Sequence, residues 1–139
     1  MDRATKIYAA VLLAGVAVLL FSIFYENPQV ARLNDLLEAD PQVSAFPYHF
    51  HVIRLEGGTA VMSTPRNTTM PVYRVLGILF PGLSGQHPDA PDFQAAQRRL
   101  AQTQKRARKL VIDQPEVKAV RWELDREWLF EHGLLRTPN

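Results

Sequence analysis

Two histidines spaced two residues apart are the first candidates for chemistry in this sequence. His49 and His51 lie in a run of alternating character, and on an extended strand both imidazoles project to the same side. Two such rings can bind zinc or copper if further ligands join them. The chain has no cysteine, and its other histidines, His87 and His132, fall in a predicted loop and a short predicted helix. We therefore expect a polar strand face rather than a metal site, and we assign neither a metal nor another cofactor.

The sequence carries no recognisable catalytic motif. There is no His-Glu-x-x-His segment and no glycine-rich phosphate loop. The lack of cysteine also excludes thiol catalysis and thiolate-bound zinc. No serine lies in a nucleophile motif; the serines are Ser22, Ser44, Ser63 and Ser84. We therefore assign no catalytic residues, and an enzyme of unrecognised type is the last of the three functions considered below.

A cluster of positive charge is the strongest polar feature. Residues 98–109 carry six cations and no acid: Arg98, Arg99, Lys105, Arg106, Arg108 and Lys109. On a helix Arg98, Lys105 and Lys109 share one side, and Arg106 flanks them. We take Arg98, Lys105, Arg106 and Lys109 as candidates to bind anionic lipid headgroups or an acidic protein. The alternative is an ordinary solvated helix face. Nucleic acid is not expected, because no aromatic residues are interleaved with these cations.

Residues 70–83 form the second apolar stretch of the chain. The stretch is too short to span a bilayer, and Pro71, Gly77 and Pro81 interrupt it. It is either a core element or an apolar surface that contacts a partner or the membrane. For the second alternative the candidate partner-binding residues are Tyr73, Leu76, Leu79 and Phe80.

The elements that position these residues follow from hydrophobic periodicity and from turn residues. Asn27 and Pro28 begin a helix, Gly57 and Gly58 form a hairpin turn, and Asp125 can cap a last short helix. The predicted elements are helices over 28–39, 92–113 and 126–132 and strands over 48–55, 59–64 and 117–124. This order predicts an α+β domain. Trp122, in the middle of the last strand, is expected to be buried against the 92–113 helix.

The segment that determines location is residues 7–25, which are apolar and carry no charge. As a helix it spans about 28 Å, close to the thickness of a bilayer core. Because its end is bulky and aromatic, an uncleaved anchor is favoured over a signal peptide. Arg3 and Lys6 place the N-terminus in the cytoplasm. Residues 1–25 are thus the cytoplasmic tip and anchor, and residues 26–139 form a periplasmic domain on the inner membrane. Ala10 and Ala14 permit close packing of two anchors, and hence a homo-oligomer.

The domain resembles BON domains, which are small bacterial envelope modules. The similarity lies in DPQV before the hairpin, GGTAVMST at its turn and QPEVKAVRWEL at the end, and it covers roughly residues 30–64 and 92–124. Two departures are an insertion over 66–91 and Glu116 where the pattern has glycine. The resemblance implies an αββαβ fold and attachment to phospholipid or envelope partners without catalysis. The whole chain is also similar to small single-pass membrane proteins of proteobacteria.

These observations lead to three functions in order of preference. The first is a non-catalytic accessory or interaction subunit of an inner-membrane protein assembly. The second is a BON-like module that binds phospholipid or another envelope component. The third is an enzyme. The expected partners are a membrane protein complex and the lipid bilayer.

Overall fold

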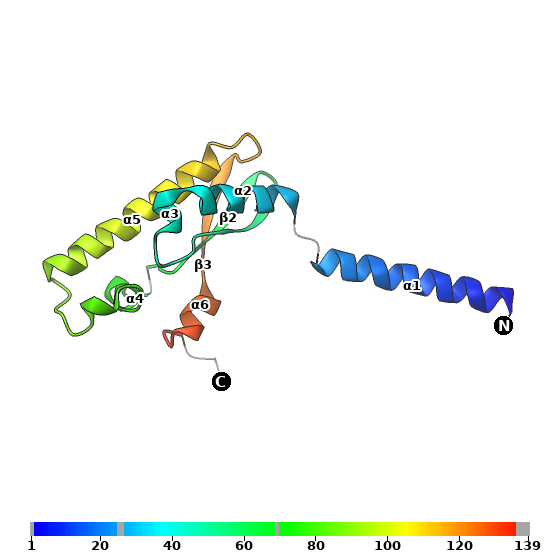
Figure 1. Cartoon of the computed structure of the whole chain (residues 1–139), viewed down its shortest axis with the longest axis horizontal. Coiled ribbons are helices and arrows are strands. Elements are labelled where there is room, and N and C mark those ends of the chain that lie inside the picture. Colours follow the sequence, from blue (N-terminus) through cyan, green and yellow to red (C-terminus); the bar gives the residue numbers. More distant parts are fainter. Residues whose placement is uncertain (1, 25–26, 69, 136–139) are drawn as a thin grey trace.

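The computed structural model describes residues 2–24, 27–68 and 70–135 and shows an α+β protein with a long N-terminal helix (Figure 1). Tyr25, the end of the predicted anchor, lies outside the described residues. In chain order the elements are α1 (Arg3–Phe24), α2 (Pro28–Ala39), α3 (Pro41–Ser44), β1 (Val52–Glu56), β2 (Thr59–Thr64), α4 (Val72–Leu79), the 3₁₀ helix η1 (Pro81–Leu83), α5 (Pro91–Ile112), β3 (Ala119–Leu124) and α6 (Arg126–Glu131).

β2 is the central strand of a three-stranded sheet of order β1-β2-β3. It pairs antiparallel with β1 and parallel with β3. Gly57 and Gly58 form the hairpin turn with φ of 55° and 86°, a conformation that glycine adopts without steric cost. Parallel strands cannot be joined by a tight turn, so α4, η1 and α5 form the crossover from β2 to β3.

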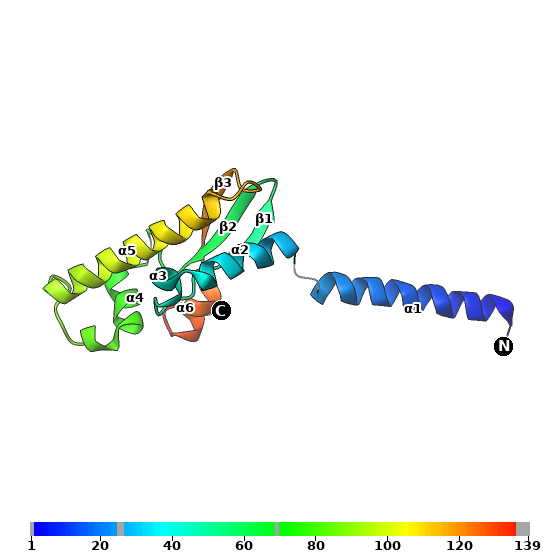
Figure 2. The same ribbon diagram turned by 45° about the horizontal axis from the view of Figure 1, so that its top comes forward.

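The helices α2 and α5 pack against the sheet (Figure 2), α2 on β1 and α5 on β2 and β3. In α5 the buried residues recur every three or four positions, which is the spacing of one helical face. These residues are Phe93, Ala96, Leu100, Thr103, Ala107 and Val111. Thr103 is the polar member, and its hydroxyl is satisfied because it donates to the Arg99 carbonyl at 2.7 Å.

The predicted elements are present with small differences at their ends. The 28–39 helix is confirmed, and the predicted 92–113 helix is α5. The first strand begins at Val52 rather than at residue 48, although Tyr48 and Phe50 lie in the core at 1% and 0% exposure. The prediction that Trp122 is buried against the 92–113 helix is wrong, because its side chain is only partly buried. Its indole packs edge-to-face with Phe50, with ring centroids 6.2 Å apart, while the indole also borders a surface hollow.

The apolar stretch of residues 70–83 forms α4 and η1 and contributes to the core. Val75, Leu76, Leu79 and Leu83 are all at most 7% exposed. The core alternative therefore accounts for most of this stretch. α4 packs against α5, so the segment between β2 and α5 extends the hydrophobic core beyond the sheet.

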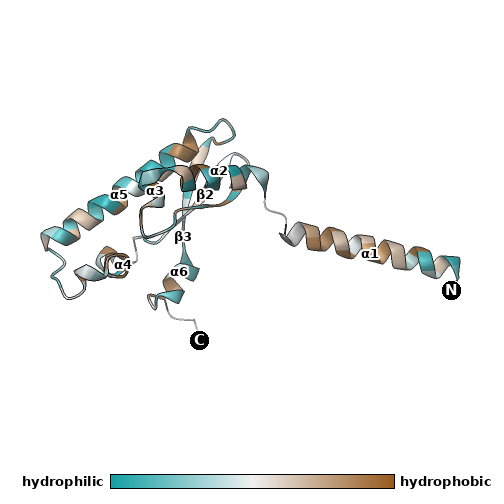
Figure 3. Ribbon diagram, viewed as in Figure 1, coloured by the Kyte–Doolittle hydropathy of each residue, from teal (hydrophilic) through white to brown (hydrophobic). Residues whose placement is uncertain are grey.

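α1 is apolar along most of its length (Figure 3), and its described residues are not buried against the rest of the chain. Residues Arg3–Phe21 form one helix that is long and apolar enough to cross a membrane. Length and composition alone do not distinguish an anchor from a signal sequence. Ala10 and Ala14 lie on this exposed helix and have no partner within the described chain.

Candidate functional site

The two histidines of the predicted polar face lie side by side. The rings of His49 and His51 are stacked with centroids 5.7 Å apart, so both project to the same side, as predicted. His49 Nε2 lies 3.9 Å from Glu38 Oε1. Among the described residues no group of three or more His, Asp or Glu side chains is arranged to hold a metal ion. This pair therefore gives no support for metal chemistry.

A series of hydrogen bonds connects His51 with the buried Ser63 and Tyr48 and ends at Asp125. The His51 Nδ1 lies 2.9 Å from the Ser63 Oγ, and the Ser63 hydroxyl also hydrogen-bonds to Tyr48. The Tyr48 hydroxyl donates to Asp125 Oδ2 at 2.7 Å. Burial raises the pKa of Tyr48 far above its ordinary value, and Asp125 adds to this effect. Ser63 is 1% exposed, so no substrate reaches its oxygen. These hydrogen bonds instead hold β2 against the start of α6.

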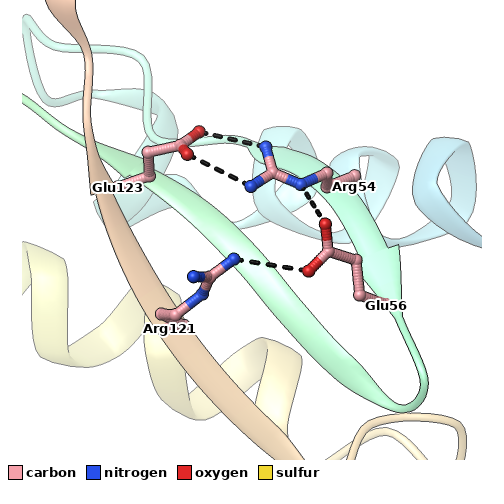
Figure 4. Close-up of polar contacts among 4 residues, drawn as sticks. All are labelled: Arg54, Glu56, Arg121 and Glu123. Carbon is pink, nitrogen blue, oxygen red and sulfur yellow. Dashed lines mark hydrogen bonds and ion pairs between the residues drawn. The ribbon is translucent and has the colours of Figure 1, made fainter.

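A quartet of charged residues covers Val61 on one face of the sheet (Figure 4). Arg54 binds Glu123 through two hydrogen bonds of 3.1 Å, and it also donates to Glu56. Arg121 binds the other Glu56 oxygen at 3.3 Å. Arg54 lowers the pKa of Glu123. Val61 is 0% exposed, so the quartet covers an apolar residue, and its carboxylates are already paired with arginines.

The candidate cations of α5 divide into paired and unpaired groups. Arg106 donates from Nε and Nη2 to Asp40 Oδ1 at 3.1 and 2.8 Å. This bond lowers the pKa of Asp40, while burial acts in the opposite direction. Asp40 also caps α3 by accepting from the Val43 amide. Lys109 pairs with Asp113, one turn further on, at 3.2 Å. Arg106 and Lys109 thus have intramolecular partners, which leaves them less able to bind a ligand.

Arg98, Lys105 and Arg108 have no ion-pair partner in the part of the chain that the structure describes. The same is true of Arg66, which follows β2 in sequence. Three of these side chains, Arg66, Lys105 and Arg108, line one hollow of about 270 Å³, together with Ala101, Gln104 and Trp122. Arg66 and Ala101 also line a second hollow of about 460 Å³, which continues toward Gln94, Gln97 and Arg98. We call these two adjoining hollows the α5 basic groove.

Among the residues that the structure describes, no aspartate or glutamate lines the α5 basic groove. Its polar lining consists of arginine, lysine and glutamine. Thr64 Oγ1 donates to Gln104 Oε1 at 3.3 Å, so the Gln104 amide group still has hydrogens to donate. Unpaired guanidinium and ammonium groups bind carboxylates and phosphates through charge-assisted hydrogen bonds. The groove therefore has the chemistry of an anion-binding surface.

The four predicted apolar partner-binding residues differ in how far they are exposed. Leu76 and Leu79 are 1% and 7% exposed and offer almost no surface to a partner. Phe80 is partly buried and packs against Phe46, with ring centroids 5.9 Å apart. The Arg99 guanidinium lies over both rings. Only Tyr73, at 48% exposure, presents a large apolar surface.

Sequence reasoning missed Arg66, Arg108 and Trp122 as members of the groove and overlooked two ion pairs. Arg108 was counted in the cation cluster but was not chosen as a candidate binding residue. Arg66 is 32 residues from Arg98 in sequence, and Trp122 was expected inside, so neither was placed near the α5 cations. The Lys109–Asp113 pair follows the i,i+4 spacing of a helix, and this spacing was a usable signal. The bond from Arg106 to Asp40 joins positions 66 apart, which no local pattern indicates.

Comparisons with known proteins place the chain in no family. No family model matches it, and no significant match is found among curated proteins or solved structures. Function is therefore inferred from the geometry of the α5 basic groove.

Proposed function

We propose that this protein is a non-catalytic accessory or interaction subunit of a membrane protein assembly, and that it binds an acidic partner protein through the α5 basic groove. α1 is its membrane anchor, with the N-terminus in the cytoplasm and the domain in the periplasm. The observation that carries this proposal is a set of four cations that have no ion-pair partner among the described residues. They are Arg66, Arg98, Lys105 and Arg108, and no described carboxylate lines the groove around them.

A protein partner fits the groove better than a bilayer surface does. The groove consists of two open hollows, and Trp122 borders one of them, so it has room for side chains. Peripheral membrane binding commonly adds apolar residues that insert beside the cations. Outside α1 the exposed large hydrophobic residues of the described chain are Ile53, Tyr73 and Phe130, and none of them lines the groove. Phospholipid binding, which the BON resemblance implies, is the second candidate.

The test compares one charge reversal in the groove with one outside it. Lys105→Glu changes the groove, while Arg74→Glu makes the same change of charge at an exposed position of α4. The full chain is purified in mild detergent at low and high salt, and the copurifying membrane protein is quantified. We expect a stoichiometric partner that Lys105→Glu releases and Arg74→Glu retains. Its yield falls as salt rises, because screening shortens the reach of charges from about 10 Å at 0.1 M to about 3 Å at 1 M.

Two results contradict the proposal. One is a partner that is retained equally by both variants, which places its binding site elsewhere. The other is binding to anionic phospholipid vesicles that Lys105→Glu abolishes, in the absence of any protein partner. That second result assigns the same groove to lipid headgroups and favours the BON-like function.

A further inference from the structure

We propose that the α5 basic groove takes an extended acidic segment of about six residues with one aromatic side chain, whose ring packs against Trp122. This inference rests on the proposed function and names the chemistry of the partner segment. Its three parts are the length of the groove, the charge of its lining and the indole at one end.

The length follows from the residues of α5 that line the groove. They run from Gln94 to Arg108, and the 14 helical rises between these residues span about 21 Å. An extended chain rises about 3.3 Å per residue, so about six residues span this distance. The two hollows measure about 270 and 460 Å³. They suit the side chains of one extended strand better than a helix, whose diameter with side chains is about 10–12 Å.

The charge of the lining sets the composition of the segment. Arg98 lies toward one end, and Lys105 and Arg108 toward the other, so cations are distributed along the groove. Arg66 faces both hollows. An acidic residue at every second or third position of the segment can therefore meet a cation. Because arginine binds carboxylates through two parallel hydrogen bonds, Arg66 and Arg108 favour acidic side chains over neutral ones.

The aromatic position follows from Trp122 and its neighbours. The indole packs edge-to-face with Phe50 in the core, at an interplanar angle of 75°. Beside the indole the small Ala101 side chain leaves the hollow open. A ligand ring placed there stacks on an indole that is already held in place, and it is flanked by Lys105 and Arg108. Cations beside aromatic rings add a favourable electrostatic contact.

The experiment uses two fluorescein-labelled hexapeptides and the full chain in detergent. Both peptides carry five glutamates, and at one terminal position they differ in having phenylalanine or serine, because Trp122 lies at one end of the groove. Binding is measured by fluorescence anisotropy. We expect the phenylalanine peptide to bind about tenfold more tightly, as one aromatic contact with its buried area predicts. Ala101→Leu should remove that preference by filling the hollow, while Phe130→Leu, an exposed aromatic residue elsewhere, should keep it.

The outcomes separate this inference from the proposed function. If both peptides bind equally and Lys105→Glu releases both, the groove binds acidic segments but Trp122 selects no aromatic residue, and the inference is overturned. If neither peptide binds, the proposed function fails with it. The comparison of two peptides on the unmodified protein does not depend on any variant being folded. Thermal melts of Ala101→Leu and Phe130→Leu confirm that both variants retain the fold.

Discussion

Leu76 tests the assignment of residues 72–79 to the core. Its side chain is 1% exposed in α4, which packs against α5. Truncating a buried leucine to alanine costs about 2–5 kcal/mol, from lost transfer free energy and from the cavity left behind. A domain of this size has a total stability of about 5–15 kcal/mol. We therefore expect Leu76→Ala to remove a large part of the free energy of unfolding.

The effect on melting is measurable against a matched control. For a domain of about 110 residues, 1 kcal/mol shifts the melting temperature by about 4 °C, so Leu76→Ala should lower it by about 8–20 °C. Tyr73→Ala lies on the same helix one turn earlier, where the side chain is 48% exposed. This change should cost less than about 1 kcal/mol. The assay is circular dichroism of the full chain in one detergent, with heating.

The pair of variants distinguishes a core helix from a binding surface. A Leu76→Ala protein that melts within 2–3 °C of the parent, about the effect of a surface change, would refute the packing of α4. If that stable variant also lost its partner, Leu76 would be assigned to the partner-binding surface instead of the core. If Leu76→Ala melts early and Tyr73→Ala alone weakens partner binding, the exposed side of α4 forms part of the interface.

Three other predictions concern charge and topology. Because Arg106 depresses the pKa of Asp40, their bond stabilises the fold above about pH 4 and is lost as pH falls through the folded pKa. Denaturation midpoints should show a shallower acid decline in Asp40→Asn than in the parent. Burial raises the pKa of Tyr48, so stability should fall above about pH 10, and Tyr48→Phe should reduce that decline in the same assay. A periplasm-dependent reporter fused after Asn139 should be active; activity of a cytoplasm-dependent reporter there reverses the orientation.

The fold was largely predictable because its signals are local. Asn27 does cap α2, accepting from the Gln29 amide at 2.9 Å, and Gly57 and Gly58 do form the hairpin turn. Hydrophobic periodicity also predicted the 92–113 helix, which is α5. These features depend on neighbours within one helical turn or one hairpin, which is the range that sequence patterns report.

The candidate site was only partly predictable because its parts meet through the tertiary fold. The density of cations in residues 98–109 indicated a basic surface on this helix. It did not indicate which of these cations form ion pairs within the chain. Asp40 neutralises Arg106 from another element, whereas Arg66 joins Lys105 and Arg108 from the end of a strand. An alternating strand predicted a buried Trp122. It lies on an edge strand beside α5, where the helix does not cover it completely.

Attachment to a membrane lowers the intrinsic affinity for a membrane-bound partner that the groove requires. If α1 spans the membrane as proposed, the domain and a membrane-bound partner share one thin layer, and the second contact becomes nearly intramolecular. Effective concentrations in such linked systems reach the millimolar range, so a binding site of modest intrinsic affinity is occupied. A short acidic segment on three exposed cations and the partly buried Arg66 supplies affinity of that kind, because exposed ion pairs contribute about 0–1 kcal/mol each. The aromatic contact at Trp122 then supplies specificity that charge alone does not. Removing α1 should therefore weaken partner binding far more than it weakens binding of the free hexapeptide, which gains nothing from the anchor.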